Sequence, residues 1–297
     1  EGALDRYDLL IMPRADTLTR SMIEHIAAFA EKGGRVIADQ SLRASLPHAQ
    51  IVPFDFTHQS RMDGTHLAKN DAVTAEEDRE IMEKYASELA PLIEDIPRPC
   101  AAATSRVLVN TLEGGNARYH FFINDDRTYG PRFGQWKLHF ELGVPQTAEA
   151  RIAIEGRPAL YDALRRKPIE YHEENGFAVF PIRMTAARGK LITALPEPVK
   201  QVEVTGSSGL RRGEPAEYQV RILGDSGNPI DAVLPLKIAL TDGADRRIDV
   251  RKYAAAAKGL CTIPILPALN DAAGTWRLTV AELIAGKTGE IEISVLP

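Results

Sequence analysis

The sequence predicts a multidomain protein in which an α/β segment with a partial parallel sheet precedes two antiparallel β-sandwiches. Three observations predict this order. Short apolar runs alternate with an amphipathic helix in the first 99 residues, the hydrophobic period changes to two at Arg106, and turn residues then separate the strands. A chain of 297 residues with 44% hydrophobic side chains can fill two or three ordinary cores.

The first segment carries the pattern of a βαβ unit. The consecutive apolar run Leu9–Met12 is typical of a strand that is covered on both faces. Apolar residues then recur at helical spacing, at Leu18, Met22, Ile26 and Phe29. The pair Gly33-Gly34 ends this helix, where a left-handed cap favours glycine, and residues 35–38 resume a strand. A short third strand is expected at residues 50–54.

A second helix is predicted near the end of this segment. Thr74 begins a capping-box pattern, and the apolar stripe that follows consists of Ile81, Tyr85, Leu89 and Leu92. We expect this helix to pack on the other face of the sheet or to bridge to the next domain. Pro97 and Pro99 cannot continue a helix, so the first domain is expected to span residues 1–99.

The middle segment, residues 106–198, is predicted to be an antiparallel β-sandwich. Its apolar runs are short and are separated by Gly, Asn, Asp and Pro turns. The expected strands are 107–109, 119–123, 151–154, 177–180 and 191–195. The linker Pro196-Glu197-Pro198 closes the segment, and composition leaves open whether it is rigid or hinged.

The last segment, residues 201–297, shows cleaner alternation and predicts an immunoglobulin-like sandwich of about seven short strands. The residues expected to face its core are Tyr218, Val220, Ile222, Trp276, Leu278, Val280, Ile291, Ile293 and Val295. The cysteine pair of antibody domains is absent from the sequence.

Composition excludes several classes of function. The net charge of −5 and the scattered Lys and Arg residues argue against a nucleic-acid partner. No apolar run approaches the length of a membrane-spanning helix. Cys100 and Cys261 fall in different predicted domains, so neither a disulfide nor a zinc site is expected. The start Glu-Gly-Ala is typical of a processed or truncated product.

The carboxyl end of the parallel sheet is a common place for a nucleophile, and here the sequence predicts none. No G-x-S-x-G or G-x-C-x-G pattern follows the strand at residues 35–38. We interpret Ser41 as a loop or helix-cap serine. Gly33-Gly34 precedes a strand instead of linking a strand to a helix, so it is not a nucleotide fingerprint.

A long loop concentrates two carboxylates and two imidazoles. Their oxygen and nitrogen atoms are the donors that hard and borderline metals accept, and the candidate ligands are Asp55, His58, Asp63 and His66. Their spacing matches no established site, so a polar surface loop is the favoured interpretation.

The middle segment offers a candidate carbohydrate contact. Aromatic faces can stack on a sugar ring while carboxylates bind its hydroxyls, and the residues concerned are Tyr129, Phe133, Trp136, Asp125 and Asp126. His120 and His139 are expected on neighbouring strands. The alternative is structural, because the stretch 124–126 is also a good turn and Trp136 can seal a contact between domains.

The first 40 residues resemble a known family. The run Tyr7–Pro13, the helix after it and residues 31–38 resemble the second half of the glutamine-amidotransferase-like fold. They are similar to the trimerisation domain that follows the catalytic barrel in one family of β-galactosidases. The resemblance implies a partial flavodoxin-like sheet, because the early strands of the family are missing. It transfers no catalytic residue, since the cysteine nucleophile is absent and the carboxylates belong to the barrel.

The two β segments resemble accessory modules. Residues 159–164 are similar to an edge of the small β domain that ends many glycoside hydrolases. Residues 213–218 and 273–280 resemble macroglobulin-type or bacterial Ig-like modules of envelope and secreted proteins. The resemblance implies that Trp276 fills the core of its sandwich. These are analogies of fold, which do not establish function.

These observations predict a non-catalytic accessory or assembly region of a larger periplasmic, envelope or secreted bacterial protein, associated with a glycoside hydrolase. The expected partners are an upstream domain of the same polypeptide or other subunits, with no cofactor. Two alternatives stay open. One is a carbohydrate-binding module, and the other is a metal-dependent or degenerate hydrolase.

Overall fold

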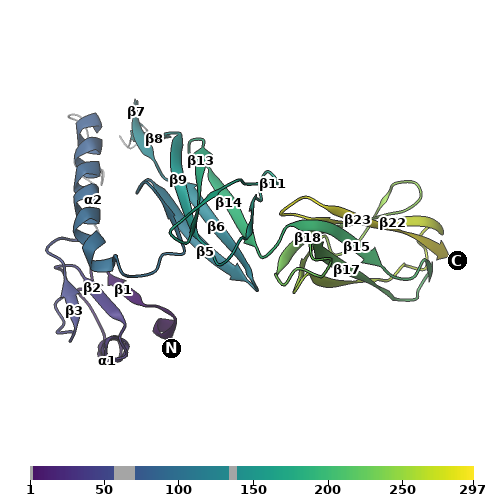
Figure 1. Cartoon of the computed structure of the whole chain (residues 1–297), viewed down its shortest axis with the longest axis horizontal. Coiled ribbons are helices and arrows are strands. Elements are labelled where there is room, and N and C mark those ends of the chain that lie inside the picture. Colours follow the sequence, from purple (N-terminus) through teal and green to yellow (C-terminus); the bar gives the residue numbers. More distant parts are fainter. Residues whose placement is uncertain (1–2, 57–70, 134–138) are drawn as a thin grey trace. The chain divides into compact units, whose positions relative to one another are not determined.

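The computed structural model describes residues 3–56, 71–133 and 139–297. The chain forms two compact units. Residues 1–98 and 127–142 make up the first, and residues 99–126 and 143–297 make up the second (Figure 1).

The first unit contains a small parallel sheet with the order β1-β2-β3. After the short 3-10 helix Ala3–Arg6, its strands are β1 (Leu9–Met12), β2 (Arg35–Ala38) and β3 (Ala49–Ile51). The predicted βαβ unit is confirmed, with α1 joining β1 to β2. The flavodoxin-like sheet that the resemblance implied is not found, because the described residues supply three short strands here.

Helix α1 (Arg20–Glu31) begins and ends where the sequence favours caps. The hydroxyl of Thr19 accepts the N–H of Met22 at 3.3 Å and so satisfies one of the free amides of the first turn. At the other end, the N–H of Gly34 donates to the carbonyl of Phe29 at 3.0 Å. Gly33 has a φ of +98°, which a residue with a Cβ adopts only under strain.

The two helices cover opposite faces of β2. Val36 and Ala38 pack with residues of α1, whereas Ile37 packs with Tyr85 and other residues of α2 (Asp71–Ile93). The expectation that the second helix packs on the other face is therefore confirmed. The capping box predicted its start near Thr74, but the helix already begins at Asp71. Propensity locates helix ends less reliably than helix interiors.

The second unit begins with an antiparallel sandwich. One sheet has the order β11-β10-β14-β6-β5 and the facing sheet the order β12-β13-β9-β4. The strands are β4 (Cys100–Ala102), β5 (Val107–Gly114), β6 (Ala117–Asn124), β9 (Gln146–Ala153), β10 (Ala159–Asp162), β11 (Lys167–Pro168), β12 (His172–Glu174), β13 (Phe177–Met184) and β14 (Gly189–Leu195). All five predicted strands are present.

The core of this sandwich lies between its two sheets. Alternate side chains of β6 and β13 point inward, and the rings of Phe122 and Phe180 meet edge to face at 6.5 Å. Ile152 and Ile192 are fully buried beside them. The strands β7 (Arg127–Phe133) and β8 (His139–Gly143) form a separate two-stranded sheet.

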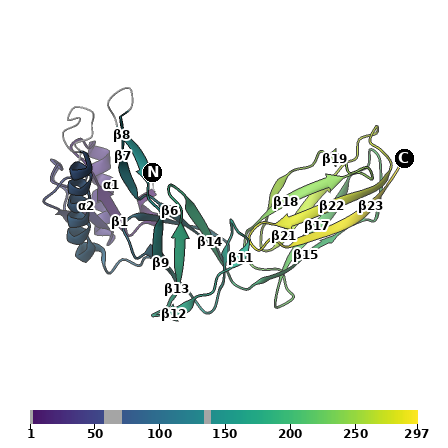
Figure 2. The same ribbon diagram turned by 90° about the horizontal axis from the view of Figure 1, so that it is seen from above.

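The last sandwich follows in the same unit, and its strands run side by side in Figure 2. One sheet has the order β15-β17-β21, and the other has the order β16-β23-β22-β18-β19 with β20 beside β18. The strands are β15 (Val199–Thr205), β16 (Gly209–Arg211), β17 (Ala216–Gly224), β18 (Leu234–Thr241), β19 (Arg247–Ile248), β20 (Tyr253–Ala256), β21 (Leu260–Ile265), β22 (Gly274–Glu282) and β23 (Thr288–Leu296).

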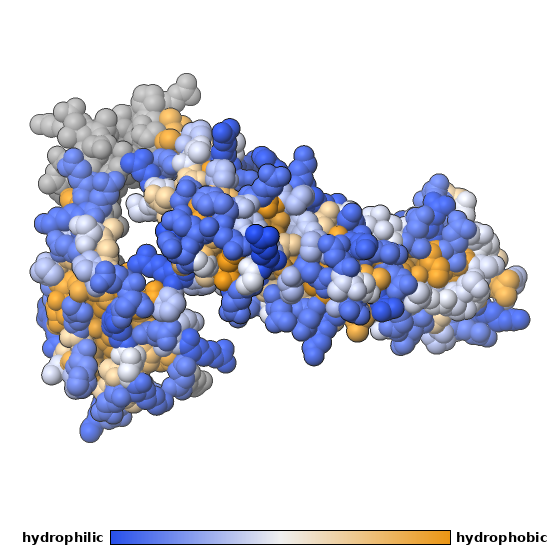
Figure 3. Space-filling model, in the orientation of Figure 1, coloured by the Kyte–Doolittle hydropathy of each residue, from blue (hydrophilic) through white to orange (hydrophobic). Residues whose placement is uncertain are grey.

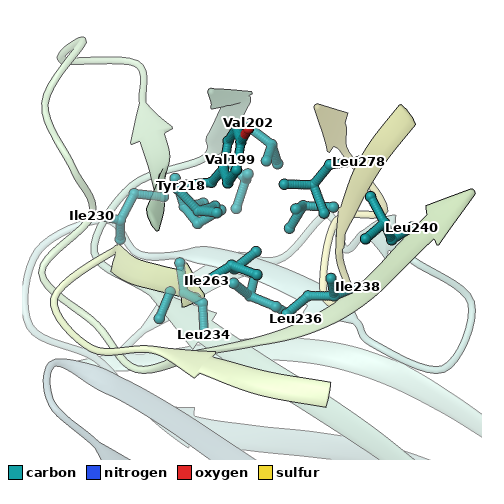
Figure 4. Packing of buried hydrophobic residues seen from close by; sticks show 14 of the residues in the cluster. Val199, Val202, Tyr218, Ile230, Leu234, Leu236, Ile238, Leu240, Ile263 and Leu278 are labelled. Carbon is teal, nitrogen blue, oxygen red and sulfur yellow. The ribbon is translucent and has the colours of Figure 1, made fainter. Parts of the chain in front are cut away.

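The alternating pattern correctly predicted the core of this sandwich. Tyr218 and Trp276 are fully buried, as expected, while Ile291 is only partly buried. Figure 4 shows the apolar side chains of β18 lying opposite Val199 and Val202. Because alternate residues of a strand face the same side, a local pattern is enough to select these side chains.

Candidate functional site

The carboxyl end of the parallel sheet is organised by Asp39, a buried side chain that directly follows β2. Its Oδ2 accepts the N–H of Arg14 at 2.8 Å and the N–H of Phe56 at 3.3 Å. Its Oδ1 accepts the N–H of Ser41 at 3.1 Å and the hydroxyl of the same serine. Burial raises the pKa of Asp39, but these hydrogen bonds outweigh burial and hold the pKa below its usual value.

This arrangement gives Ser41 a structural partner. A nucleophilic serine needs a base that takes its proton, and a carboxylate with a lowered pKa that already accepts three backbone amides is a poor base. Asp39 instead ties together the loops that follow β1, β2 and β3. The sequence signal was an aspartate directly after an apolar strand, which matches no motif and was missed.

The four residues predicted as metal ligands lie mostly beyond the described part of the chain. Asp55 is described, and its Oδ1 is buried without a hydrogen-bond partner. His58, Asp63 and His66 fall within residues 57–70, outside the described residues. Among the described residues, no three His, Cys, Asp or Glu side chains gather as metal ligands. The metal site therefore stays a prediction.

The predicted carbohydrate contact includes a carboxylate that is held inside the protein. Asp126 is buried, lies 3.3 Å from a guanidinium nitrogen of Arg106 and accepts a hydrogen bond from Gln146. Its N–H donates to Oδ1 of Asn124 at 3.0 Å, which forms the turn that the sequence also allowed. Asp125 is exposed. Only Asp125 of this pair is thus placed to meet a ligand.

The aromatic part of that contact is not described. Trp136 lies outside the described residues, as do the side chains of Tyr129 and Phe133 on β7. The expectation that His120 and His139 lie on neighbouring strands is wrong, because β6 pairs with β5 and β14 whereas β8 pairs with β7. Strand pairing is a tertiary property that spacing along the chain does not determine.

A hollow of about 460 Å³ opens beside the β5–β6 turn of the first sandwich, and sequence reasoning did not find it. Its polar wall includes Glu113, Asn116, Arg118 and Glu155. Its apolar wall consists of Ala153, Ile154, Pro158, Ala194, Leu195 and Pro196. These residues come from distant parts of the sequence, and no local motif links them.

The guanidinium of Arg118 lies between two carboxylates of this hollow. Its Nε is 3.5 Å from Oε1 of Glu113, and its NH2 is 3.7 Å from Oε1 of Glu155. A third nitrogen donates to the carbonyl of Ala153 at 3.4 Å. Both glutamates are exposed and the distances are long, so these ion pairs are weak. The donors of Arg118 and the glutamate acceptors can therefore bind the hydroxyl groups of a ligand.

His120 lies two positions along β6 from Arg118 and so faces the same side of the sheet. Its Nδ1 is 2.9 Å from the hydroxyl of Thr111, while its Nε2 is buried without a partner. Burial, with a smaller contribution from the charge of Arg118, lowers the pKa of His120 to about 4. The imidazole is therefore neutral at physiological pH.

Within the second unit, the two sandwiches meet through the turn that follows β5. Gly115 forms an antiparallel bridge with Ala232, and the N–H of Val233 donates to the carbonyl of Gly114 at 2.8 Å. The hydroxyl of Tyr119 donates to the carbonyl of Val233. These bonds join the sandwiches by backbone pairing as well as by side chains.

The linker of residues 196–198 is held at two points. The carboxylate of Glu197 accepts the N–H of Ser226 at 2.8 Å and its hydroxyl at 2.9 Å. Just beyond the linker, the N–H of Val199 donates to the hydroxyl oxygen of Tyr161 at 3.2 Å. The question that composition left open is thus answered within this unit, where the linker is docked.

A buried acid, Glu282, lies near the same junction. Its carboxylate accepts the N–H of Ile284 at 2.5 Å and the N–H of Ala285 at 2.8 Å. Burial raises its pKa in spite of these bonds and of the nearby charge of Arg166. Burial also raises the pKa of Tyr119 to about 12, with a smaller contribution from Glu282.

Comparison with protein-family models and with curated proteins found no match. Among solved structures, an α-L-fucosidase isoenzyme of Paenibacillus thiaminolyticus is similar over 63% of this chain and 40% of its own, with 12% identity and a TM-score of 0.40. A glycosyl hydrolase family 2 member of Bacteroides cellulosilyticus matches 61% of this chain and 25% of its own, with 9% identity and a TM-score of 0.27.

The adhesin InvE of Yersinia pseudotuberculosis matches 66% of this chain and 60% of its own, with 9% identity and a TM-score of 0.29. These structural neighbours are two glycoside hydrolases and an adhesin, at similarities that assign neither a family nor an activity. None of the described helices is long and apolar enough to cross a membrane. The face in Figure 3 carries hydrophobic residues singly or in small groups among hydrophilic ones.

Proposed function

We propose that this chain is a non-catalytic accessory and assembly region of a larger periplasmic, envelope or secreted bacterial protein, associated with a glycoside hydrolase. The observation that carries the proposal is the docked junction within the second unit. Backbone pairing at Gly115 and Ala232, and the Val199–Tyr161 hydrogen bond, restrain both sandwiches at separate points. Such a junction suits a region that holds neighbouring domains at a fixed separation.

In this proposal the chain contains three domains, at residues 1–99, 106–198 and 201–297. The first is an abbreviated amidotransferase-like domain of the trimerisation type. Its support is the small parallel sheet, in which Asp39 ties loops together where related folds present a nucleophile. The partners are an upstream domain of the same polypeptide or other subunits, and no cofactor is required.

Distance measurements by pulsed electron resonance on the full chain test the rigid junction. Spin labels at Glu174→Cys and Glu292→Cys occupy exposed strand positions in the two sandwiches, in a Cys261→Ser background. We expect one narrow distance distribution, which Tyr161→Phe broadens. A broad distribution for the native junction contradicts the proposal. Hydrolysis of an aryl-glycoside panel by this purified chain contradicts its non-catalytic part.

A second candidate function is carbohydrate binding, and the Arg118 hollow favours it. Sugar hydroxyls pair with planar amide, guanidinium and carboxylate groups, while the apolar wall suits the C–H face of a sugar ring. The hollow adds a site to the predicted contact of Tyr129, Phe133, Trp136 and Asp125. Asp126 takes part only through the turn that it stabilises.

Nuclear magnetic resonance titration with neutral hexoses and polysaccharide fragments tests this second candidate. We expect shifts for the amides around Arg118 that Arg118→Leu abolishes and the exposed control Arg277→Leu retains. Loss of binding in Trp136→Ala alone moves the site to the β7–β8 region. No saturable binding to either region removes the candidate.

A third candidate function is a metal-dependent hydrolase, and a single observation supports it. The Oδ1 atom of Asp55 is buried and has no hydrogen-bond partner. His58, Asp63 and His66 complete the proposed ligand set. Elemental analysis of protein purified without chelator decides this candidate. We expect stoichiometric transition metal that Asp55→Ala removes, and a sub-stoichiometric content excludes the site.

A further inference from the structure

The edge strand β5 carries little of the protection that sheet edges usually have, with Glu113 as its one charged residue. It ends the five-stranded sheet of the first sandwich and spans eight residues, with neither proline nor lysine. Leu108 and Leu112 are 51% and 54% exposed, and Val109 between them is 38% exposed. Unpaired edges with apolar side chains are templates for pairing with another strand.

The hydrogen bonds around β6 show which backbone groups of β5 face the free edge. The N–H of Asn124 donates to the carbonyl of Arg188, the residue directly before β14. The N–H of Asp125 donates to the carbonyl of Arg106, the residue directly before β5. Along an antiparallel strand the backbone N–H and C=O groups of successive residues point alternately to one neighbouring strand and to the other. Odd-numbered residues of β6 therefore bond to β5, and their partners in β5 are the even-numbered residues. The backbone groups of Val109 and Thr111 therefore point to the free edge.

One of these groups is covered by a side chain of the same strand. The N–H of Thr111 donates to Oδ1 of Asn110 at 2.9 Å. This local bond is the kind that Asn side chains offer in competition with a strand ladder. It leaves the backbone groups of Val109 for another strand.

We propose that β5 pairs with β5 of a second copy of this chain, antiparallel and about a two-fold axis at Asn110. The two five-stranded sheets then continue as one. Val109 of each copy exchanges both backbone hydrogen bonds with Thr111 of the other, which releases the Asn110 side chain. Strand addition of this kind supplies main-chain hydrogen bonds, and the side chains set its register.

Side-chain pairing selects this register. It sets Leu108 of each copy directly opposite Leu112 of the other, on the same face of the joined sheet. A shift of one residue in either copy separates these leucines.

The same strand already takes part in an interface at its carboxyl end. Gly114 and Gly115 pair with residues 232–233 of the last sandwich through the bond and the bridge described above. The proposed contact is continuous with this interface and uses the stretch of β5 before it. A two-fold axis is the commonest symmetry of soluble homo-oligomers, and it makes the contact self-limiting.

Analytical ultracentrifugation of the full chain over a range of concentrations tests the pairing. We expect a reversible dimer. Val109→Pro removes an N–H that serves no bond inside the sandwich, and Leu112→Lys places a charge on the edge without changing the backbone. Each is expected to weaken dimerisation at least tenfold, while the exposed control Leu269→Lys leaves it unchanged. Circular dichroism checks that each variant is folded.

A cross-link tests the register and the identity of the occupant. Residue 110 meets its own copy at the axis, in a pair without mutual hydrogen bonds whose Cα separation of about 4.5 Å permits a disulfide. In a Cys261→Ser background, Asn110→Cys is expected to give a covalent dimer on oxidation and Leu108→Cys is not. A chain that is monomeric at all concentrations overturns the proposal. So does a dimer that neither edge variant weakens, or one that Asn110→Cys fails to cross-link.

Discussion

The backbone N–H of Val199 donates to the hydroxyl oxygen of Tyr161 at 3.2 Å, and both groups are buried. Val199 opens the first strand of the last sandwich, while Tyr161 belongs to β10 of the preceding one. A single side chain thus satisfies the first amide after the linker. Burial also raises the pKa of the Tyr161 hydroxyl, which keeps it protonated at neutral pH.

Tyr161→Phe is expected to lower the free energy of unfolding by about 1–2 kcal/mol, because the buried N–H of Val199 loses its acceptor. Chemical denaturation of the full chain measures the loss. Tyr253→Phe removes an exposed hydroxyl from the last sandwich and is the matched control, with an expected effect near zero. An equal effect of the two substitutions contradicts the structural role of Tyr161.

Lys190 and Asp162 form a largely buried ion pair, with 2.6 Å between Nζ and Oδ2 and side-chain exposures of 14% and 8%. Lys190→Met leaves the buried carboxylate with only a distant charge partner, the exposed guanidinium of Arg165 at 3.9 Å. We expect a loss of about 3 kcal/mol in the free energy of unfolding. The exposed pair of Arg277 and Glu292 is the control, and Arg277→Met is expected to cost less than about 0.5 kcal/mol.

His120 predicts a dependence of stability on pH. Its pKa in the folded protein is about 4, below the ordinary value of 6.5, so the unfolded chain binds the proton first as pH falls. The contribution to stability is fully present above pH 6.5 and is lost as pH falls towards 4. Using about 1.4 kcal/mol per pKa unit, we expect the free energy of unfolding to fall by about 3 kcal/mol across this window.

His120→Gln keeps a neutral polar group and removes the titration. The free energy of unfolding is measured at each pH for the native chain and for this variant. The difference between the two values isolates the contribution of His120 from that of the other ionisable groups. It should change between pH 6.5 and 4 and be constant above pH 7. A difference that stays constant over the whole range shows that His120 does not titrate as the burial predicts.

Asp39→Ala is expected to destabilise the first unit by about 2–4 kcal/mol, because three backbone amides lose a shared acceptor. Hydrogen exchange of the amides in β2 and α1 reports this unit separately from the sandwiches. Asp16→Ala, at an exposed position near the same edge, is the control. Unchanged exchange in Asp39→Ala would show that the carboxylate does not hold these loops.

The local sequence patterns correctly predicted much of the secondary structure. The 3.6-residue period predicted α1 and the stripe of α2, and the alternation along β17 and β22 selected Tyr218 and Trp276 as core residues. These predictions succeed because the direction of a side chain depends on its own strand or helix. The implied partial flavodoxin-like sheet is not found among the described residues, which form only a small parallel sheet, since a short motif does not specify how many strands join it.

The sequence by itself determined the order of the segments, the periods of their strands and helices, and the glycine-based end of α1. Only the tertiary structure decided that Asp39 ties loops, that Arg118 lines a hollow, that Tyr161 meets Val199 and that β5 is an edge. Each of these relationships joins residues from separate elements. Their proximity follows from strand pairing and docking, which depend on the register of distant segments and leave no periodic signal in either segment alone.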